Sequence, residues 1–290
     1  MPEWSPQHSL DFMKRNRVDA AILSLSAPAL TLIEEKTEAS RLCRQINEYA
    51  ASLTKLYPSS FGFFATIPSA DDMSACLDEV VHAFEILGAD GVTLLTSYGG
   101  RYLGHPDFTP LWEELNRRGA VVFIHPNLDI MRDALANPTI PRPLIDFPHE
   151  TTRTAVHMIV ANVVRRFPNC KIILSHGGGT LPYVATRVAH QSADVGYSEK
   201  SAEEFLEDAR TFYYDLALTG YDLPLDMLLK FVGPDHILYG SDFPFAREKT
   251  CRGQVANLDQ YQIEHPAGRL IQRDTALKLF HRFAERAEIT

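Results

Sequence analysis

The sequence predicts a single α/β domain, residues 1–290, built as a TIM-like (β/α)8 barrel whose first strand is missing. Three observations predict this fold. Short apolar segments alternate with helical segments along the whole chain, and no linker or change of composition divides them. Polar residues gather where the apolar segments end, which is where such barrels carry their sites. With 290 residues, 45% of them hydrophobic, the chain is long enough for one large core.

Helices are expected between the apolar segments. The first begins at Ser5 and Pro6, a pair that suits a helix cap and first turn, and ends near Arg17. Asp71 and Asp72 are placed in the first turn of the third helix, where carboxylates complement the helix dipole. The last helix is amphipathic and closes the fold. The expected helices cover residues 5–17, 36–56, 71–87, 109–118, 150–167, 181–189, 225–231 and 274–287.

Strands are expected at residues 18–25, 61–68, 91–95, 120–125, 171–175, 211–217 and 236–239. Continuous apolar runs such as residues 172–174 suit strands that are covered on both faces, as in a parallel sheet. Because a complete barrel has eight strands, the remaining one would lie before residue 5.

Composition and charge exclude several classes of protein. The net charge of −9 argues against a general nucleic-acid binder, which needs clustered Lys and Arg. Four scattered cysteines without C-x-x-C spacing predict reduced thiols in an intracellular protein. The sequence has no secretory signal and no apolar run of membrane-spanning length, so a soluble, cytoplasmic protein without a membrane partner is expected.

Three of the expected strands end near a residue that can bind a metal ion. His125 ends the fourth strand, His176 the fifth and Asp242 the seventh. Because strand ends meet at the mouth of a barrel, these side chains could converge on a divalent metal. Any one of them alone could instead cap a loop or be an ordinary core residue. Their shared position in three units favours a site.

Other segments near these strand ends are candidates for supporting roles. Arg187 could reach an anion at the mouth, although lone arginines on helices are usually solvated. Asp215, at the end of the sixth strand, could support a site residue or simply cap a turn. The Pro-rich insertion 137–148 is too long for an ordinary loop and is expected to cover the mouth. Phosphate-loop, dinucleotide and serine-hydrolase motifs are absent from the sequence.

Together these segments resemble the amidohydrolase-related decarboxylases, a family that includes aminocarboxymuconate-semialdehyde, γ-resorcylate and 6-methylsalicylate decarboxylases. The resemblance covers nearly the whole chain. It rests on residues 123–126, on residues 174–179 with Leu181, Pro182 and Arg187, and on residues 238–244. Residues 90–92 and 100–104, leading into 110–112, are similar to the 6-methylsalicylate type.

The resemblance implies a barrel of the metal-dependent hydrolase type that removes CO2 from a small aromatic acid, such as a hydroxybenzoate or a 6-methylsalicylate-like acid. It implies that His125 and Asp242 are metal ligands and that His176 and Asp242 handle protons. Arg187 would meet the substrate carboxylate across an interface in a homodimer or larger homo-oligomer. The implied cofactor is a divalent metal, zinc first and manganese second, without an organic cofactor.

The family also carries an H-x-H or E-x-H pair on its first strand, and this sequence contains no H-x-H. Two explanations are open. The natural start lies upstream of Met1, or the chain is a natural short form with a weakened or absent metal site.

Two other functions stay open at this point. The same metal and His176 could activate water, which would make the chain a hydrolase of a small ester, lactone or amide. Alternatively, a barrel without a full metal site could be non-catalytic and bind a ligand or pair with a complete subunit. The fold does not separate these functions, because one fold hosts many activities.

Overall fold

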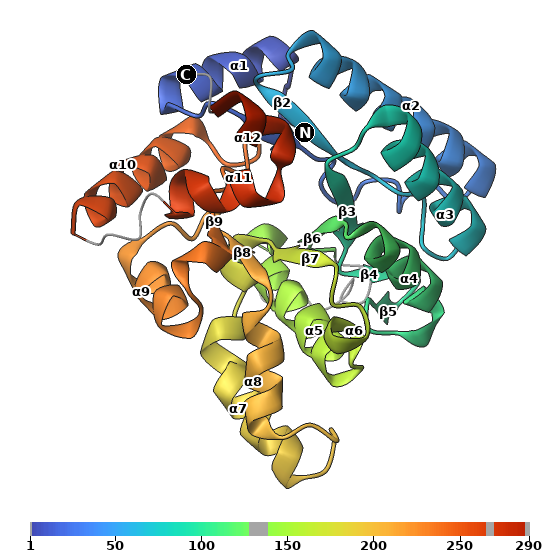
Figure 1. Cartoon of the computed structure of the whole chain (residues 1–290), viewed down its shortest axis with the longest axis vertical. Helices are drawn as coiled ribbons and strands as arrows, with labels where there is room; N and C mark the ends of the chain where they lie inside the picture. Colours follow the sequence, from blue (N-terminus) through green and yellow to red (C-terminus); the bar gives the residue numbers. More distant parts are fainter. Residues whose placement is uncertain (1, 128–138, 265–269, 288–290) are drawn as a thin grey trace.

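A parallel sheet organises the molecule (Figure 1). The computed structural model describes residues 2–127, 139–264 and 270–287. Every neighbouring pair in the sheet is parallel, as predicted. Its strands, in spatial order, are β1 (Ala21–Leu23), β2 (Phe61–Ala65), β3 (Gly91–Leu95), β6 (Val121–His125), β7 (Lys171–Leu174), β8 (Tyr213–Asp215) and β9 (Ile237–Leu238).

Helices cover the outer face of this sheet. Alternate strand residues, such as Val92 and Val122, form one large apolar cluster with helix residues that include Leu111 and Met158. The helices that follow or flank the strands are α2 (Lys36–Leu56), α3 (Met73–His82), α4 (Thr109–Arg118), α5 (Asp146–Val160), α6 (Val163–Arg166), α7 (Leu181–Asp194), α8 (Ala202–Arg210) and α9 (Asp222–Phe231).

The opposite face of the sheet lines the interior of the curl. Phe64, Val121 and Ile173 pack there with Phe280. Phe280 lies between α11 (Thr275–Leu279) and α12 (His281–Ala287), and its ring centroid is 5.8 Å from that of Phe64. Val121 starts the strand that His125 ends. The C-terminal helices therefore fill the interior on the side away from the strand ends.

The described sheet is open, because β1 and β9 each pair with a strand on one side only. An apolar cluster joins helix α1 (Pro6–Asn16) to β1 and to the segment after β9. In it, Phe12 stacks on Phe243 with ring centroids 4.1 Å apart. The side chain of Arg15 also pairs with Glu248, at the start of α10 (Glu248–Glu264), at 2.7 Å. These contacts cover the two edges without closing the barrel.

Several elements were not predicted. A short hairpin, β4 (Ser97–Tyr98) with β5 (Arg101–Tyr102), follows β3, and helices α8 and α10 lie where no helix was expected. The expected helix 150–167 differs at its start and in its middle: α5 begins at Asp146, and Asn162, with a φ of 61°, separates α5 from α6. The expected helix 274–287 is likewise divided at Phe280.

The expected position of Asp72 is also corrected. It is the N-cap of α3, where its carboxylate accepts the Ala75 N–H at 3.2 Å, rather than a residue of the first turn.

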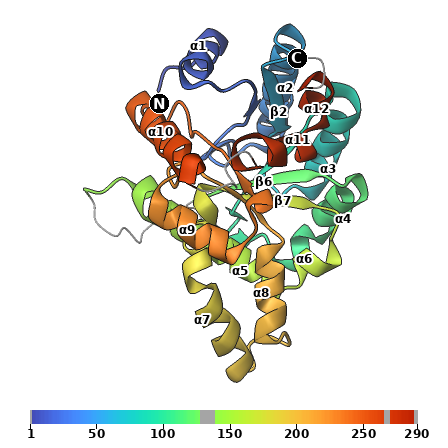
Figure 2. The same cartoon turned by 60° about the vertical axis from the view of Figure 1, so that its left-hand side comes forward.

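Helices α7 and α8 pack against each other and project from the body as a helical hairpin (Figures 1 and 2). A capping box begins α8, because the Ser201 hydroxyl accepts the Glu204 N–H while the Glu204 carboxylate accepts the Ser201 N–H. None of the described helices combines the length and apolarity that crossing a lipid bilayer requires.

Candidate metal centre

Three metal-binding side chains converge where the parallel strands end. His125 is the last residue of β6, His176 follows β7 and Asp242 follows β9. One ligand atom from each lies within 4.8 Å of the other two. The centroids of the two imidazole rings are 5.8 Å apart. The structure therefore brings together the three residues that the sequence pattern had placed at one mouth.

Two of these residues adopt an unusual backbone conformation. His176 and Asp242 both have a φ of 54°, in the left-handed region. Residues other than glycine enter this region at a cost of about 1 kcal/mol or more, and such strain is concentrated at functional sites. The turn continues through Gly177, with a φ of 63°. At both strand ends the chain thus turns sharply at the residue whose side chain joins the cluster.

Burial keeps both imidazoles neutral at physiological pH. Burial, followed by the neighbouring His176, lowers the pKa of His125 to about 3. Burial alone lowers the pKa of His176 to about 4. The Nδ1 atom of His125 lies 3.0 Å from the carbonyl oxygen of Pro126. A proton on Nδ1 would be donated to that carbonyl, which leaves Nε2 as the free lone pair that a metal needs.

Burial also raises the pKa of two carboxyl groups. For Asp242, burial and then the charge of Asp215 raise the pKa to about 7. For Asp215, burial raises the pKa to about 6, although backbone N–H groups of Ala217 and His176 favour its charged form. A carboxylate in this position is stabilised by a cation, so the cluster is suited to one.

Asp215 lies beside the cluster rather than within it. Its carboxylate accepts the Ala217 N–H at 2.6 Å, and the backbone N–H of His176 also bonds to it. A Cβ atom at Gly240 would overlap this carboxylate. Asp215 therefore links the loops after β7, β8 and β9, and it holds the backbone that carries His176.

The donor set fits a divalent metal ion. Nδ1 of His176 is buried and has no hydrogen-bond partner among the described residues. Two neutral imidazoles and one carboxylate are ligands that zinc, manganese and similar ions accept. With one imidazole and the carboxylate on the ion and the second imidazole beside it, coordination positions would remain for a substrate, as in catalytic rather than structural sites.

Some residues at the mouth were not predicted from the sequence. The N–H of Thr96, just after β3, donates to the His125 carbonyl at 3.0 Å, and its hydroxyl accepts the Asn127 N–H at 2.9 Å. The ring of Phe147 stands edge-on to His125, with centroids 5.8 Å apart. Phe147 belongs to the insertion expected to cover the mouth, of which residues 137 and 138 lie outside the described residues. The one sequence signal that could have indicated these residues was the position of Thr96 directly after a predicted strand.

Arg187 is not brought to the cluster within one chain. It lies on the exposed face of α7, in the projecting hairpin (Figure 2). In the described part of the chain, no hydrogen bond or ion pair joins it to another residue. A role at the site would require a neighbouring molecule.

The glycines after His176 allow a test of local packing. Replacing Gly179 with Ala should cost about 3 kcal/mol or more of unfolding free energy, because its φ is +65° and a Cβ would overlap the carbonyl oxygen of Pro148. Gly196 has a φ of +68° and nothing within 4 Å of its Cβ position, so Ala there should cost only about 1 kcal/mol. Urea unfolding of both variants checks this, and equal losses would contradict the close contact.

Comparison with known proteins places the chain in a family. A family model described as amidohydrolase matches residues 1–282. The chain belongs to the amidohydrolase family. Two curated proteins that are similar to this amidohydrolase in sequence are fungal decarboxylases. Decarboxylase yanB of Aspergillus niger is 46% identical over 100% of this chain and 82% of its own length. The 6-methylsalicylic acid decarboxylase of Penicillium expansum is 40% identical over 97% of this chain and 88% of its own.

Solved structures share the amidohydrolase fold described above. The crystal structure of an amidohydrolase II aligns with a TM-score of 0.89 and 30% identity, covering 97% of this chain and 90% of the other. A dihydroxybenzoic acid decarboxylase from Polaromonas, with bound manganese and an inhibitor, aligns with a TM-score of 0.81 at 23% identity over 94% and 85% of the two chains. The expected parallel barrel-type fold is therefore confirmed, in an open form.

Proposed function

We propose that this amidohydrolase is a metal-dependent decarboxylase that removes CO2 from a small aromatic hydroxy acid, such as a hydroxybenzoate or a 6-methylsalicylate-like compound. The observation that carries the proposal is the convergence of His125, His176 and Asp242 within 4.8 Å at the strand ends. Similarity to two fungal decarboxylases over almost the whole chain supports it.

The residues of the cluster suit the proton chemistry of this reaction. Loss of CO2 from an aromatic ring leaves an electron pair that the ring carbon must not carry alone. In the proposed reaction, His176, which is neutral at rest, takes up a proton from solvent and passes it to the ring carbon that bears the carboxylate. The carbon–carbon bond then breaks, its electron pair restores the aromatic ring, and the carboxylate leaves as CO2. His176 and Asp242 exchange protons with solvent to complete the cycle.

The proposed ligands of the ion are His125 and Asp242, with His176 beside them. A divalent ion there would supply charge stabilisation and orientation of the acid. Zinc is the proposed ion, and manganese is the alternative that two structural relatives hold. The proposal includes no organic cofactor.

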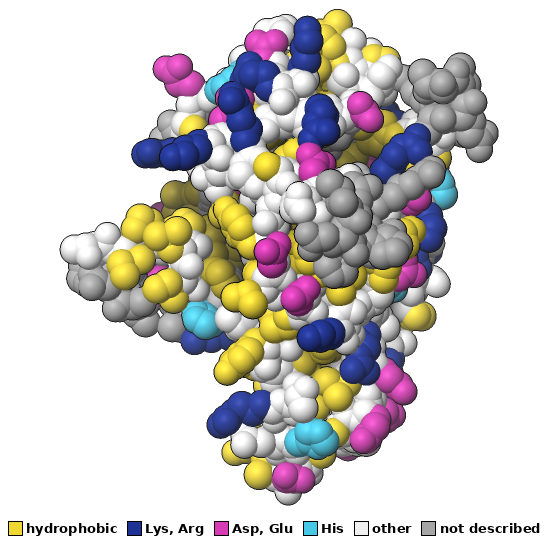
Figure 3. All heavy atoms as spheres, turned by 90° about the vertical axis from the view of Figure 1, so that its left-hand side faces the viewer, with side chains coloured by type: hydrophobic (Ala, Val, Ile, Leu, Met, Phe, Trp, Pro, Cys, Tyr) yellow, Lys and Arg dark blue, Asp and Glu magenta, His cyan; other side chains and the backbone are white. Residues whose placement is uncertain are grey.

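The chain is also proposed to act as a homodimer or larger homo-oligomer. Figure 3 shows hydrophobic side chains gathered on one face of the molecule. Tyr183 of α7 is 79% exposed and Leu223 of α9 is 83% exposed. Arg187 lies four residues after Tyr183 and so shares its helix face. A second copy seated against this face of α7 would cover Tyr183 and receive Arg187 near its own substrate carboxylate.

Replacing Arg187 with Ala is expected to raise KM about tenfold or more, since an ion pair with the substrate carboxylate would be lost. The metal content should stay unchanged. Arg117, an exposed arginine of α4 paired with Glu114, provides a matched control whose replacement should leave KM unaltered. Steady-state kinetics of both variants make the comparison. Equal KM values for Arg187→Ala and the wild type would contradict the role.

The proposed setting is the cytoplasm. Cys43, Cys76, Cys170 and Cys251 are all free thiols. Unpaired cysteines persist in reducing compartments, which supports an intracellular location without identifying it further.

Product analysis tests the proposed function. Metal-loaded protein is incubated with hydroxybenzoic acids, including 6-methylsalicylate, and separately with small esters and lactones. CO2 and the matching phenol in equal amounts are expected. Hydrolysis of an ester or lactone, without CO2 from any aromatic acid, would favour the hydrolase alternative. No turnover together with no bound metal would favour the non-catalytic alternative.

A further inference from the structure

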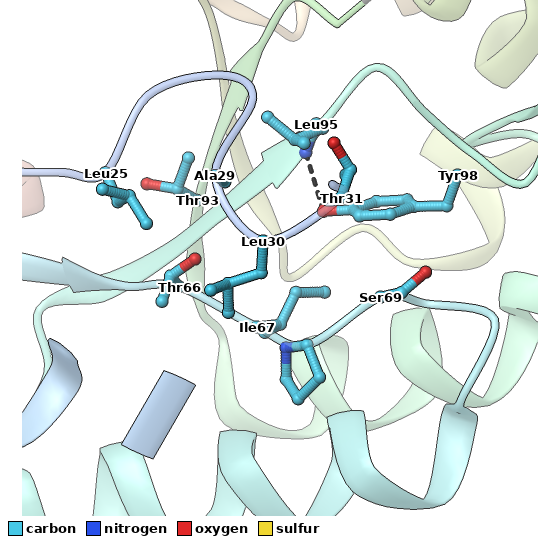
Figure 4. Close-up of a pocket in the computed structure, with 11 residues that line it drawn as sticks. Leu25, Ala29, Leu30, Thr31, Thr66, Ile67, Ser69, Thr93, Leu95 and Tyr98 are labelled. Atoms are coloured by element: carbon cyan, nitrogen blue, oxygen red, sulfur yellow. Dashed lines mark hydrogen bonds between the residues drawn. The ribbon is translucent and has the colours of Figure 1, made fainter. Parts of the chain in front are cut away.

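A small cavity lies where β2 and β3 end, one strand away from His125 (Figure 4). Its free volume is about 10 Å³. This is room for a single water-sized group. The residues around it come from β3, from the segments that follow β1 and β2, and from Tyr98 of β4; they include Leu30, Thr66, Ile67, Thr93 and Leu95.

The strand register places the cavity on the same side of the sheet as the metal cluster. Thr93 pairs with Phe123, whose ring stacks on Phe64 of the interior cluster. Leu95 pairs with His125. Directly paired residues on parallel strands point to the same face, so the two β3 residues face the inside of the curl, as His125 does. The cavity and the cluster therefore lie on the same face of the sheet, at the carboxyl ends of neighbouring strands.

The walls of the cavity combine apolar surface with hydroxyl groups. Thr93 is only 4% exposed, and its hydroxyl is buried without a hydrogen-bond partner among the described residues. Burying an unpaired hydroxyl is unfavourable, so a ligand atom that bonds to it is favoured. Leu30 and Ile67 add apolar surface, and none of the described residues that line the cavity is charged. These walls suit a neutral group with one hydrogen-bonding atom.

The cavity wall is held in place by buried contacts. Asn47 donates to the Thr66 carbonyl and accepts the Thr66 N–H, each at 2.9 Å. The same amide donates to the buried Glu79 at 2.7 Å, and Glu79 pairs with Arg44. On the other side, the Leu95 N–H donates to the Tyr98 hydroxyl at 2.9 Å, as Figure 4 shows. The backbone at both strand ends is therefore fixed before a ligand arrives.

We infer that this cavity is a specificity subsite for one ring substituent of the aromatic acid, and that it selects a small, neutral, hydrogen-bonding group such as a phenolic hydroxyl. The inference rests on the proposed function, because the acid's carboxylate must lie at the metal cluster. In this subsite the hydroxyl of Thr93 binds the ring substituent. A methyl group in place of that substituent would leave the Thr93 hydroxyl unpaired, and a second carboxylate on the ring would be excluded.

Calorimetric binding to metal-loaded protein tests the inference without requiring turnover. The ligands are salicylates that carry either a hydroxyl or a methyl at each free ring position, a pair of nearly equal size. At the one ring position whose substituent enters the cavity, the wild type should bind the hydroxyl compound about tenfold more tightly than the methyl compound. Thr93→Val, which keeps the shape, should reduce that ratio to about twofold or less, while Thr93→Ser should retain it.

Three outcomes would overturn the inference. They are no hydroxyl preference at any ring position, an equal loss of affinity for both compounds in Thr93→Val, or a water molecule that still fills the cavity in a crystal structure with the acid bound. Unfolding midpoints of the two variants identify a folding defect. If binding shows the expected preference but no acid releases CO2, the proposed function fails while the subsite stands.

Discussion

Replacing Asp242 with Asn is expected to remove the bound metal and to slow decarboxylation by about 1,000-fold or more, equivalent to about 4 kcal/mol of activation free energy. The reason is the loss of the one charged group in the three-residue cluster. Asn accepts the left-handed backbone, so the φ of 54° at this position should be retained. Elemental analysis and single-turnover rates measure the two effects.

The control for this variant is Asp194→Asn, an exposed carboxylate at the end of α7. It should keep both metal and rate. Full metal occupancy in Asp242→Asn would contradict its assignment as a ligand, whatever the effect on the rate.

Replacing His176 with Asn is expected to lower kcat by about 100-fold to 10,000-fold, the usual contribution of a general acid or base. The metal content should stay close to that of the wild type, because His125 and Asp242 are the proposed ligands. Asn again suits the backbone, since His176 also has a φ of 54°. The loss of kcat with retained metal is the signature of a proton-transfer role.

His190→Asn is the matched control, because His190 is exposed on α7. It should leave kcat and metal content unchanged. If His176→Asn loses its metal, His176 is a third ligand rather than the proton-transfer residue.

The position of the candidate site could be predicted from the sequence because local signals report strand ends. His125 and His176 each follow a short apolar run and are themselves followed by Pro or Gly. In a parallel sheet all such ends lie at one edge, so convergence follows from topology. The distances within the cluster and the backbone angles of His176 and Asp242 could not be predicted from the sequence, because they depend on how the loop after each strand packs.

Features made by distant contacts could not be predicted in this way. Phe147 contacts His125 from the next helix along the chain. The face of the sheet on which the Thr93 hydroxyl is buried follows only from the pairing of its strand with the next one. Among the helices that were not expected, α8 does carry a local sequence signal, the Ser201 and Glu204 capping pair, that could have revealed it. Helix α10 was harder to detect, because its sequence lacks a clear apolar stripe.

The most direct test of the central claim is the anomalous scattering of crystals grown with manganese. One strong peak is expected about 2 Å from ligand atoms of His125 and Asp242, with His176 adjoining it. A peak elsewhere on the chain, or no peak at these residues when the protein is saturated with manganese, would contradict the assignment of this cluster as the metal centre.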